Sequence, residues 1–221
     1  MDFDQAIKER HSVRLYTEQK IEGGVLSSLQ DEISRINEES GMSIHLMLDE
    51  PKAFSGILMK TVVKFKNAVN YLVVSGPDSD TLNIDAGYYG EHLVLFAQTL
   101  GLGTCWALMA SRKNADKTLP EGHRSVILIS IGYPENPGAP HKNRPVSDVA
   151  DLTDAPEWFI KGVEYAMLAP TGMNKQGFRF ERDENRVKLI HSSSTLAQID
   201  AGIVKYHFEY GAGKGNFIWS K

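Results

Sequence analysis

The chain has 221 residues, of which 42% are hydrophobic and 24% are charged, with a formal net charge of −4. These values are typical of a folded globular protein of one large or two small domains. The acidic balance argues against a nucleic-acid or anionic-membrane protein, and no apolar run approaches the ~20 residues of a membrane helix. A single cysteine, Cys105, excludes an internal disulfide and a multi-cysteine metal site, so we expect a reduced, cytoplasmic protein.

The hydrophobic spacing predicts regular elements along the whole chain. In the first 131 residues they are, in order, a short helix near Phe3, a helix over 22–39, strands over 43–48 and 67–75, a buried helix over 84–100 and a buried strand over 125–131. A proline-rich irregular stretch over 133–145 follows. The remainder is predicted to form a helix from Pro156, a hairpin over 178–182 and 186–191, and a final helix from about Ala197. Residues 53–66 are ambiguous.

One short sequence occurs twice. Ile-Asp-Ala-Gly stands at 84–87 and again at 199–202, and His92 and His207 keep the same offset. Both copies begin a helix that follows strand-like sequence. This order favours an internal duplication over chance. We therefore divide the chain into two related halves, residues 1–150 and 151–221, which we expect to form one compact unit.

Two segments of the first half have residue types suited to ligand binding. Residues 10–14 (RHSVR) carry two guanidinium groups and a hydroxyl, which suit phosphate oxygens, although such a string alone also describes a solvated basic turn. Residues 101–106 (GLGTCW) follow the buried helix. Two glycines allow a backbone to approach a flat ligand, whereas a simple helix cap accounts for one of them.

Two later segments complete the set. Lys142 and Arg144 follow Gly-Tyr-Pro at 132–134, and alone they are ordinary surface charges. Residues 169–176 (APTGMNKQ) concentrate hydroxyl and amide groups, which can donate to and accept from the edge of a heterocycle. Taken alone, this segment also reads as an ordinary loop between a helix and a strand.

Together the four segments resemble the FMN-dependent nitroreductase family, whose motifs are R-x-S-x-[RK], A-P-S-x-x-N-x-Q, G-L-G-T-x-W and a late basic pair after G-Y-P. The resemblance spans most of the sequence and implies an α+β fold with a central, mostly antiparallel sheet flanked by helices. In the family the A-P-S segment precedes the G-L-G-T loop, whereas here it comes last. The chain looks like the family's intertwined homodimer in one polypeptide, as in a compact fused subgroup.

The resemblance implies one FMN per chain, in a monomer that works as a pseudo-dimer; further dimerisation is left open. The second half has Ala-Met-Leu at 166–168 and Gly-Lys-Gly-Asn at 213–216 in place of its own binding motifs. Arg10, Lys142 and Arg144 would bind the phosphate, Ser12 the ribityl chain or phosphate, and Arg14 the pyrimidine. The ring and the rest of the site would be completed by His11, Gly103, Thr104, Pro170, Thr171, Gly172, Asn174 and Gln176.

The implied activity is oxidoreduction. Hydride would pass from NAD(P)H through the flavin to a nitroaromatic or quinone-type acceptor in a ping-pong sequence, without a catalytic acid–base residue or a metal. His92 and His207 are interpreted as core histidines and Cys105 as a packed thiol. The alternatives are a flavin-binding or flavin-sensing module with little turnover, and a structural homologue that binds no flavin.

Overall fold

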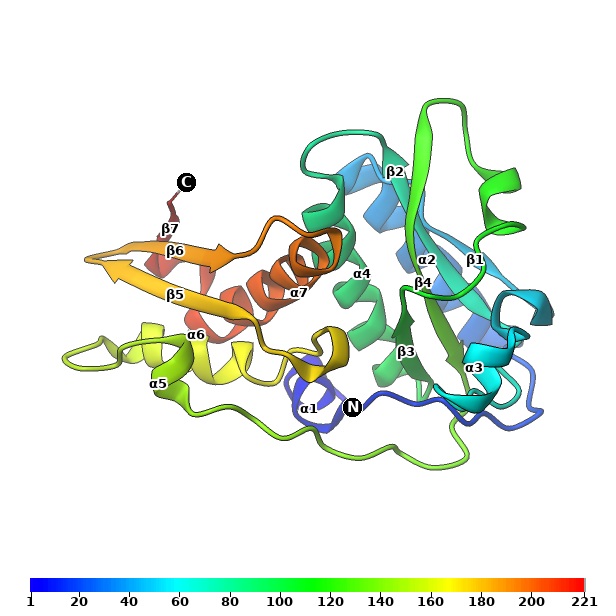
Figure 1. The fold of residues 1–221 in the computed structure, drawn as a ribbon, viewed down its shortest axis with the longest axis horizontal. Coiled ribbons are helices and arrows are strands. Elements are labelled where there is room, and N and C mark those ends of the chain that lie inside the picture. Colours follow the sequence, from blue (N-terminus) through cyan, green and yellow to red (C-terminus); the bar gives the residue numbers. More distant parts are fainter. Residues whose placement is uncertain (221) are drawn as a thin grey trace. The chain divides into compact units, whose positions relative to one another are not determined.

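The computed structural model describes residues 1–220 as an α+β protein (Figure 1). Its residues group into two compact units, residues 1–82 with 92–140, and residues 83–91 with 141 onward. Helix α4 (Leu82–Thr99) supplies its first half to the second unit and its last half to the first. The predicted fold class is confirmed. The two units are groups of residues in contact, and they do not show whether the chain arose by duplication. The expected division into duplicated halves near residue 150 therefore stays a prediction.

The first unit is built on a four-stranded antiparallel sheet. Its order is β1 (His45–Met47), β2 (Tyr71–Pro77), β4 (His123–Gly132) and β3 (Gly103–Ala107). The inner strands β2 and β4 are buried along nearly their whole length, as expected of continuous apolar runs. Strand β2 begins later than predicted, because Asn67 is left-handed (φ 53°) and the side chain of Asn70 accepts a hydrogen bond from Asp49 N.

Helices and a mixed segment make up much of the rest of this unit. Helix α1 (Phe3–Glu9) begins at Asp2, whose carboxylate caps Gln5 N, and α2 (Gly23–Ser40) ends at left-handed Gly41. The stretch 53–66 was ambiguous in sequence because its elements are short. They are the 3-10 turn η1 (Pro51–Phe54) and helix α3 (Ile57–Thr61). Its apolar side chains pack with those of one sheet face in a common core: Phe54, Met59, Phe65, Tyr71, Val73 and Leu128.

The second unit pairs helices α6 (Glu157–Ala166) and α7 (Thr195–Ala212) with a small sheet. The predicted hairpin is β5 (Phe178–Asp183) and β6 (Arg186–His191), and β7 (Ile218–Trp219) adds parallel to β6 (Figure 1). The second unit also contains the short helix α5 (Val146–Val149) and the 3-10 turns η3 (Gly172–Asn174) and η4 (Lys214–Asn216). A further 3-10 turn, η2 (Ala115–Thr118), belongs to the first unit. Aromatic rings fill the core of the second unit; Phe180 stacks on Phe208 with centroids 4.6 Å apart.

The two Ile-Asp-Ala-Gly copies meet within the second unit. A Cβ on Gly87 would lie 2.0 Å from the carbonyl oxygen of Ile199, and a Cβ on Gly202 would lie 2.0 Å from that of Ile84. The contacts are reciprocal, with each glycine facing the first residue of the other copy. Helices α4 and α7 therefore approach so closely at this crossing that neither glycine has room for a side chain.

The repeated histidines have different surroundings. His207 Nε2 lies 2.8 Å from Glu91 Oε1, its Nδ1 donates to the carbonyl of Tyr165, and both members of the His207–Glu91 pair are fully buried. His92, in the first unit, pairs with Glu32 and keeps slight contact with solvent. Both are packed histidines, as the sequence predicted. Among residues 1–220, none of the helices has the length and apolar content needed to cross a bilayer.

Candidate functional site

In the first unit, the segment after α1 lies beside the edge strand β3. Ser12 forms a parallel bridge with Thr104, and Val13 N donates to the carbonyl of Thr104 at 2.9 Å. Tyr16 links the segment to strand β4, because its hydroxyl is hydrogen-bonded to both Val13 O and Ser130 Oγ at 2.7 Å. Two of the predicted site segments, 10–14 and 103–104, are thus held side by side by backbone pairing.

The side chains of this turn form a cationic, partly buried group. Arg10 is only 5% exposed, Arg14 is exposed, and the positive charge of both acts on the nearby Cys105 thiol. Burial raises the pKa of Cys105 despite these charges and a hydrogen bond with Ser12, so this cysteine stays a packed thiol. His11 Nδ1 is buried and has no hydrogen-bond partner among residues 1–220. A buried ring nitrogen of this kind is satisfied when a ligand supplies the partner.

The Gly-Leu-Gly-Thr sequence was predicted to be a loop, and this is wrong from Gly103 onward, where strand β3 begins. Gly101 is left-handed (φ 80°) and ends the turn after α4. Gly103 has a different reason to lack a side chain: its Cβ would lie 2.7 Å from Val13 Cγ2. The second glycine therefore lets residues 10–14 pack against the strand.

In the second unit, the basic loop and the amide segment are joined. Asn174 Nδ2 donates to Lys142 O at 2.8 Å. The side-chain amide of Gln176 accepts from Arg144 N at 2.7 Å and donates to Asn143 Oδ1 at 3.0 Å. The sequence placed these segments in different halves. The structure brings 142–144 and 171–176 together through four side-chain hydrogen bonds, the three above and one from the Arg144 guanidinium to Gln176 O.

Gln176 and Arg144 differ in what remains open to a ligand. Gln176 is fully buried and both ends of its amide are engaged within the protein, so it fixes the loop. The Arg144 guanidinium donates to Asp148 Oδ2 and to Gln176 O at 3.1–3.3 Å, and its side chain is 45% exposed. An exposed ion pair of this kind is weak, so an anion can compete for the guanidinium.

The amide segment itself has a strained backbone held by an aspartate. Met173, Asn174 and Gln176 have positive φ angles of 55°, 53° and 45°. The Gly172 N–H donates to both carboxylate oxygens of Asp200 at 2.9 and 3.1 Å. Sequence analysis missed Asp200 as a site residue. Its place in the repeated Ile-Asp-Ala-Gly sequence was the signal that could have identified it.

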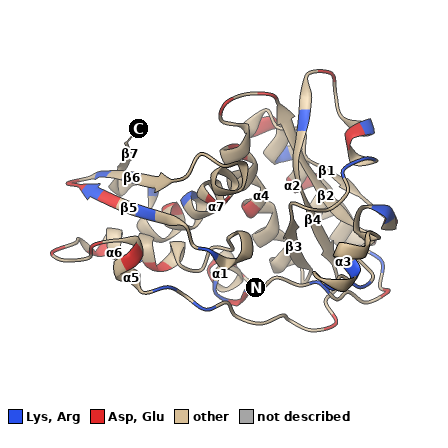
Figure 2. Ribbon diagram, viewed as in Figure 1, with Lys and Arg blue, Asp and Glu red and all other residues tan. Residues whose placement is uncertain are grey.

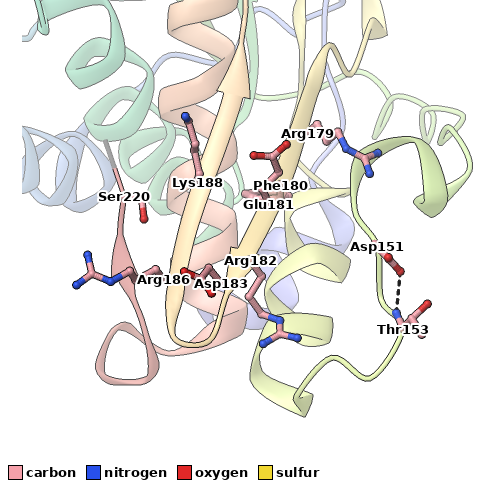
Figure 3. A pocket seen from close by; sticks show the side chains of 10 residues that line it. All are labelled: Asp151, Thr153, Arg179, Phe180, Glu181, Arg182, Asp183, Arg186, Lys188 and Ser220. Carbon is pink, nitrogen blue, oxygen red and sulfur yellow. Dashed lines mark hydrogen bonds between the residues drawn. The ribbon is translucent and has the colours of Figure 1, made fainter.

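A hollow of about 500 Å³ lies along β5 in the second unit, and none of the predicted site residues lines it. Figure 3 shows Asp151 and Thr153 on a loop facing this strand. The hairpin carries charges of both signs (Figure 2), and Glu181 pairs in register with Lys188 and Asp183 with Arg186. Opposite charges in register offset one another, so the hollow has no clear preference for an anion or a cation. Residues 1–220 contain no cluster of three or more potential metal ligands.

Solved structures share this fold. A "putative nitroreductase" from Thermotoga maritima aligns with a TM-score of 0.70 and 23% identity, over 97% of this chain and 85% of that one. A "putative nitroreductase in complex with FMN" from Exiguobacterium sibiricum has a TM-score of 0.53 and 18% identity, over 68% and 97%. A "putative NAD(P)H:FMN oxidoreductase" from Staphylococcus epidermidis has a TM-score of 0.54 and 15% identity, over 68% and 95%.

No curated protein matches this sequence. A family model does. The family model described as "Putative TM nitroreductase" matches residues 2–212, which include all four motif segments. With nearly the whole chain matched, this protein belongs to that nitroreductase family.

Proposed function

We propose that this protein is an FMN-dependent oxidoreductase that takes hydride from NAD(P)H and reduces small nitroaromatic or quinone-type acceptors. One observation carries the proposal. Four motif segments come together in two pairs, 10–14 with 103–104 and 142–144 with 171–176. Each pair combines cations with backbone or amide hydrogen-bonding groups, which is the donor set that a flavin phosphate and ring edge require.

The residues present fit FMN. Arg10, Lys142 and Arg144 supply positive charge for the phosphate, and the buried Nδ1 of His11 supplies a further polar contact. When bound, the flavin supplies hydride chemistry between a reduced nicotinamide and an oxidised acceptor. The protein's part is to bind the phosphate, to place donors at the ring edge and to exclude water. Arg14 is proposed to hold positive charge near the pyrimidine, and we assign no acid–base residue.

The remaining groups have defined roles in this proposal. Ser12 and Thr171 offer hydroxyls, and Gly103, Thr104, Pro170 and Gly172 form the backbone beside the ring. Asn174 and Gln176 hold the basic loop in place through the hydrogen bonds described above. We further propose one FMN per chain, action as a monomer, and a cytoplasmic setting.

The first experiment is a visible absorption spectrum of the purified protein with the flavin-to-protein ratio. We expect a flavin spectrum and a ratio near one. The variant Arg10→Ala/Arg144→Ala should lose FMN, whereas Arg124→Ala, which removes an arginine paired with a carboxylate as Arg144 is, should keep it. Equal retention by both variants would remove the phosphate assignment.

A second measurement separates an enzyme from a flavin-sensing module. NADH or NADPH oxidation is followed with a quinone or a nitroarene as the acceptor. Turnover supports the oxidoreductase. Bound flavin without turnover favours the sensing module, and a colourless protein that does not quench FMN fluorescence on titration contradicts both.

A further inference from the structure

The amide segment 171–176 does not hold its shape by regular structure. Three of its residues have positive φ angles, and the short η3 turn is interrupted at Met173. Positive φ in residues other than glycine costs free energy, so such a conformation persists where neighbouring contacts enforce it. The segment therefore needs anchors, and the structure shows three of them.

Two anchors have already been described: Asn174 binds the Lys142 carbonyl, and Gln176 binds Asn143 and Arg144. The third is at the beginning of the segment. Both oxygens of the Asp200 carboxylate accept the Gly172 N–H, and Thr171 Oγ1 accepts from Gln176 N at 3.0 Å, so the two ends of the turn are tied.

Asp200 comes from helix α7, outside both the segment and the basic loop, and is the anchor that carries a negative charge. The side chain is partly buried between the helix and the segment. A Cβ on Gly172 would lie 2.6 Å from Leu196 Cδ2, so the segment rests directly on α7 one turn before Asp200. A shift of Gly172 away from the carboxylate would thus also break this packing.

We propose that Asp200 is a positioning residue for cofactor binding, which sets the conformation of residues 171–176 by fixing Gly172 and makes that conformation sensitive to pH. The inference rests on the proposed FMN site. Asp200 acts through the segment, so its loss should weaken FMN binding without removing the phosphate contacts.

The pH dependence follows from the surroundings of the carboxylate. Burial raises the pKa of Asp200 to about 6, while the Gly172 N–H and the positive charge of Lys175, the charged side chain that faces it, act in the opposite direction. Above that pH the ionised group is a strong acceptor for the Gly172 N–H. Below it the protonated acid is a weaker acceptor, and the segment is less well held.

The test is the Kd for FMN, measured by flavin fluorescence quenching at pH 5, 6, 7 and 8. Asp200→Asn keeps the shape and one acceptor oxygen, and Asp85→Asn makes the same change in the other Ile-Asp-Ala-Gly copy. We expect Asp200→Asn to raise Kd by about threefold to tenfold at pH 7–8 and to match the unmodified protein at pH 5. Asp85→Asn should follow the unmodified protein throughout.

The FMN phosphate also titrates near pH 6, but it does so for every variant, so the difference between profiles isolates Asp200. Asp200→Ala should raise Kd further, by about tenfold or more at pH 7, corresponding to a lost charge-assisted hydrogen bond. Unchanged Kd in both Asp200 variants, or a profile in Asp200→Asn parallel to that of the unmodified protein, overturns the inference. Absence of FMN binding by the unmodified protein instead overturns the proposed function.

Discussion

The two Ile-Asp-Ala-Gly copies make the same backbone contacts, but the side chains in and after them have different partners. The glycines of 84–87 and 199–202 face each other, and a Cβ added to either would lie 2.0 Å from a carbonyl oxygen of the other copy. In addition, Asn83 Nδ2 donates to Gln198 Oε1 at 2.7 Å, from the position just before each copy. The histidines that follow have separate partners: His92 binds Glu32, and His207 binds Glu91.

This difference shows which parts of a repeated motif are constrained by packing. Backbone approach at a helix crossing tolerates no added atom, so the glycines are kept in both copies. Side chains that point away from the crossing meet different neighbours and can take different roles. In the second copy, Asp200 contacts the candidate cofactor segment, and beyond that copy His207 forms a fully buried pair with Glu91.

Removing the buried histidine should have the largest effect on stability. His207→Leu leaves the Glu91 carboxylate buried without this partner, and we expect a loss of about 3–5 kcal/mol in the free energy of unfolding, measured by urea denaturation. His92→Leu should cost about 1 kcal/mol, because Glu32 keeps its bonds to Arg35 and some access to water. The double variant His207→Leu/Glu91→Leu should recover part of the loss; a double variant as unstable as His207→Leu would contradict this explanation.

The glycine crossing should come next. Gly87→Ala and Gly202→Ala each place a methyl group against a backbone carbonyl that cannot rotate away, at an expected cost of about 3 kcal/mol. Gly24→Ala is the matched control, since it lies in helix α2 with nothing within 4 Å and should stabilise by about 0.5–1 kcal/mol. Urea midpoints that do not separate the crossing variants from the control would refute the close contact.

Asp200 should give a smaller effect of opposite sign. Its pKa is raised to about 6 from 3.8, so the folded state binds more protons than the unfolded state between these values. The free energy of unfolding therefore falls as pH rises from about 4 to 6, and the penalty is complete above that range. Asp200→Asn should be more stable than the unmodified protein by about 1–2 kcal/mol at pH 7 and equal to it at pH 4. Asp85→Asn is the control, and an Asp200→Asn protein less stable at pH 7 would reverse the sign we derive.

Much of the fold could be predicted because its strongest elements depend on local pattern. The apolar runs of β2 and β4 and the helix caps at Asp2 and Gly41 define elements without reference to distant residues. We predicted a loop at strand β3 because Gly101, just before the strand, and Gly103, its first residue, are typical of loops. What makes it a strand is pairing with β4, at Cys105 with Ser130 for example, and no local pattern reports that pairing.

The candidate site was predictable as a set of motifs but not as a set of contacts. The motifs identified the residues at 10–14 and 169–176, since their side-chain chemistry is visible in sequence. The bonds from Gln176 to Asn143 and from Asp200 to Gly172 join positions 33 and 28 apart, and only the folded chain shows them. Gln176, expected as a supporting residue of the cofactor site, is bonded to Arg144 N and Asn143 Oδ1 within the protein.

The reciprocal glycine crossing also limits how the gene can change. In a symmetric assembly of identical chains, one codon would supply both faces of such a crossing. Here two separate codons encode Gly87 and Gly202, and mutation at either is opposed by the carbonyl of the other copy. Substitution should therefore be slowest at these two positions.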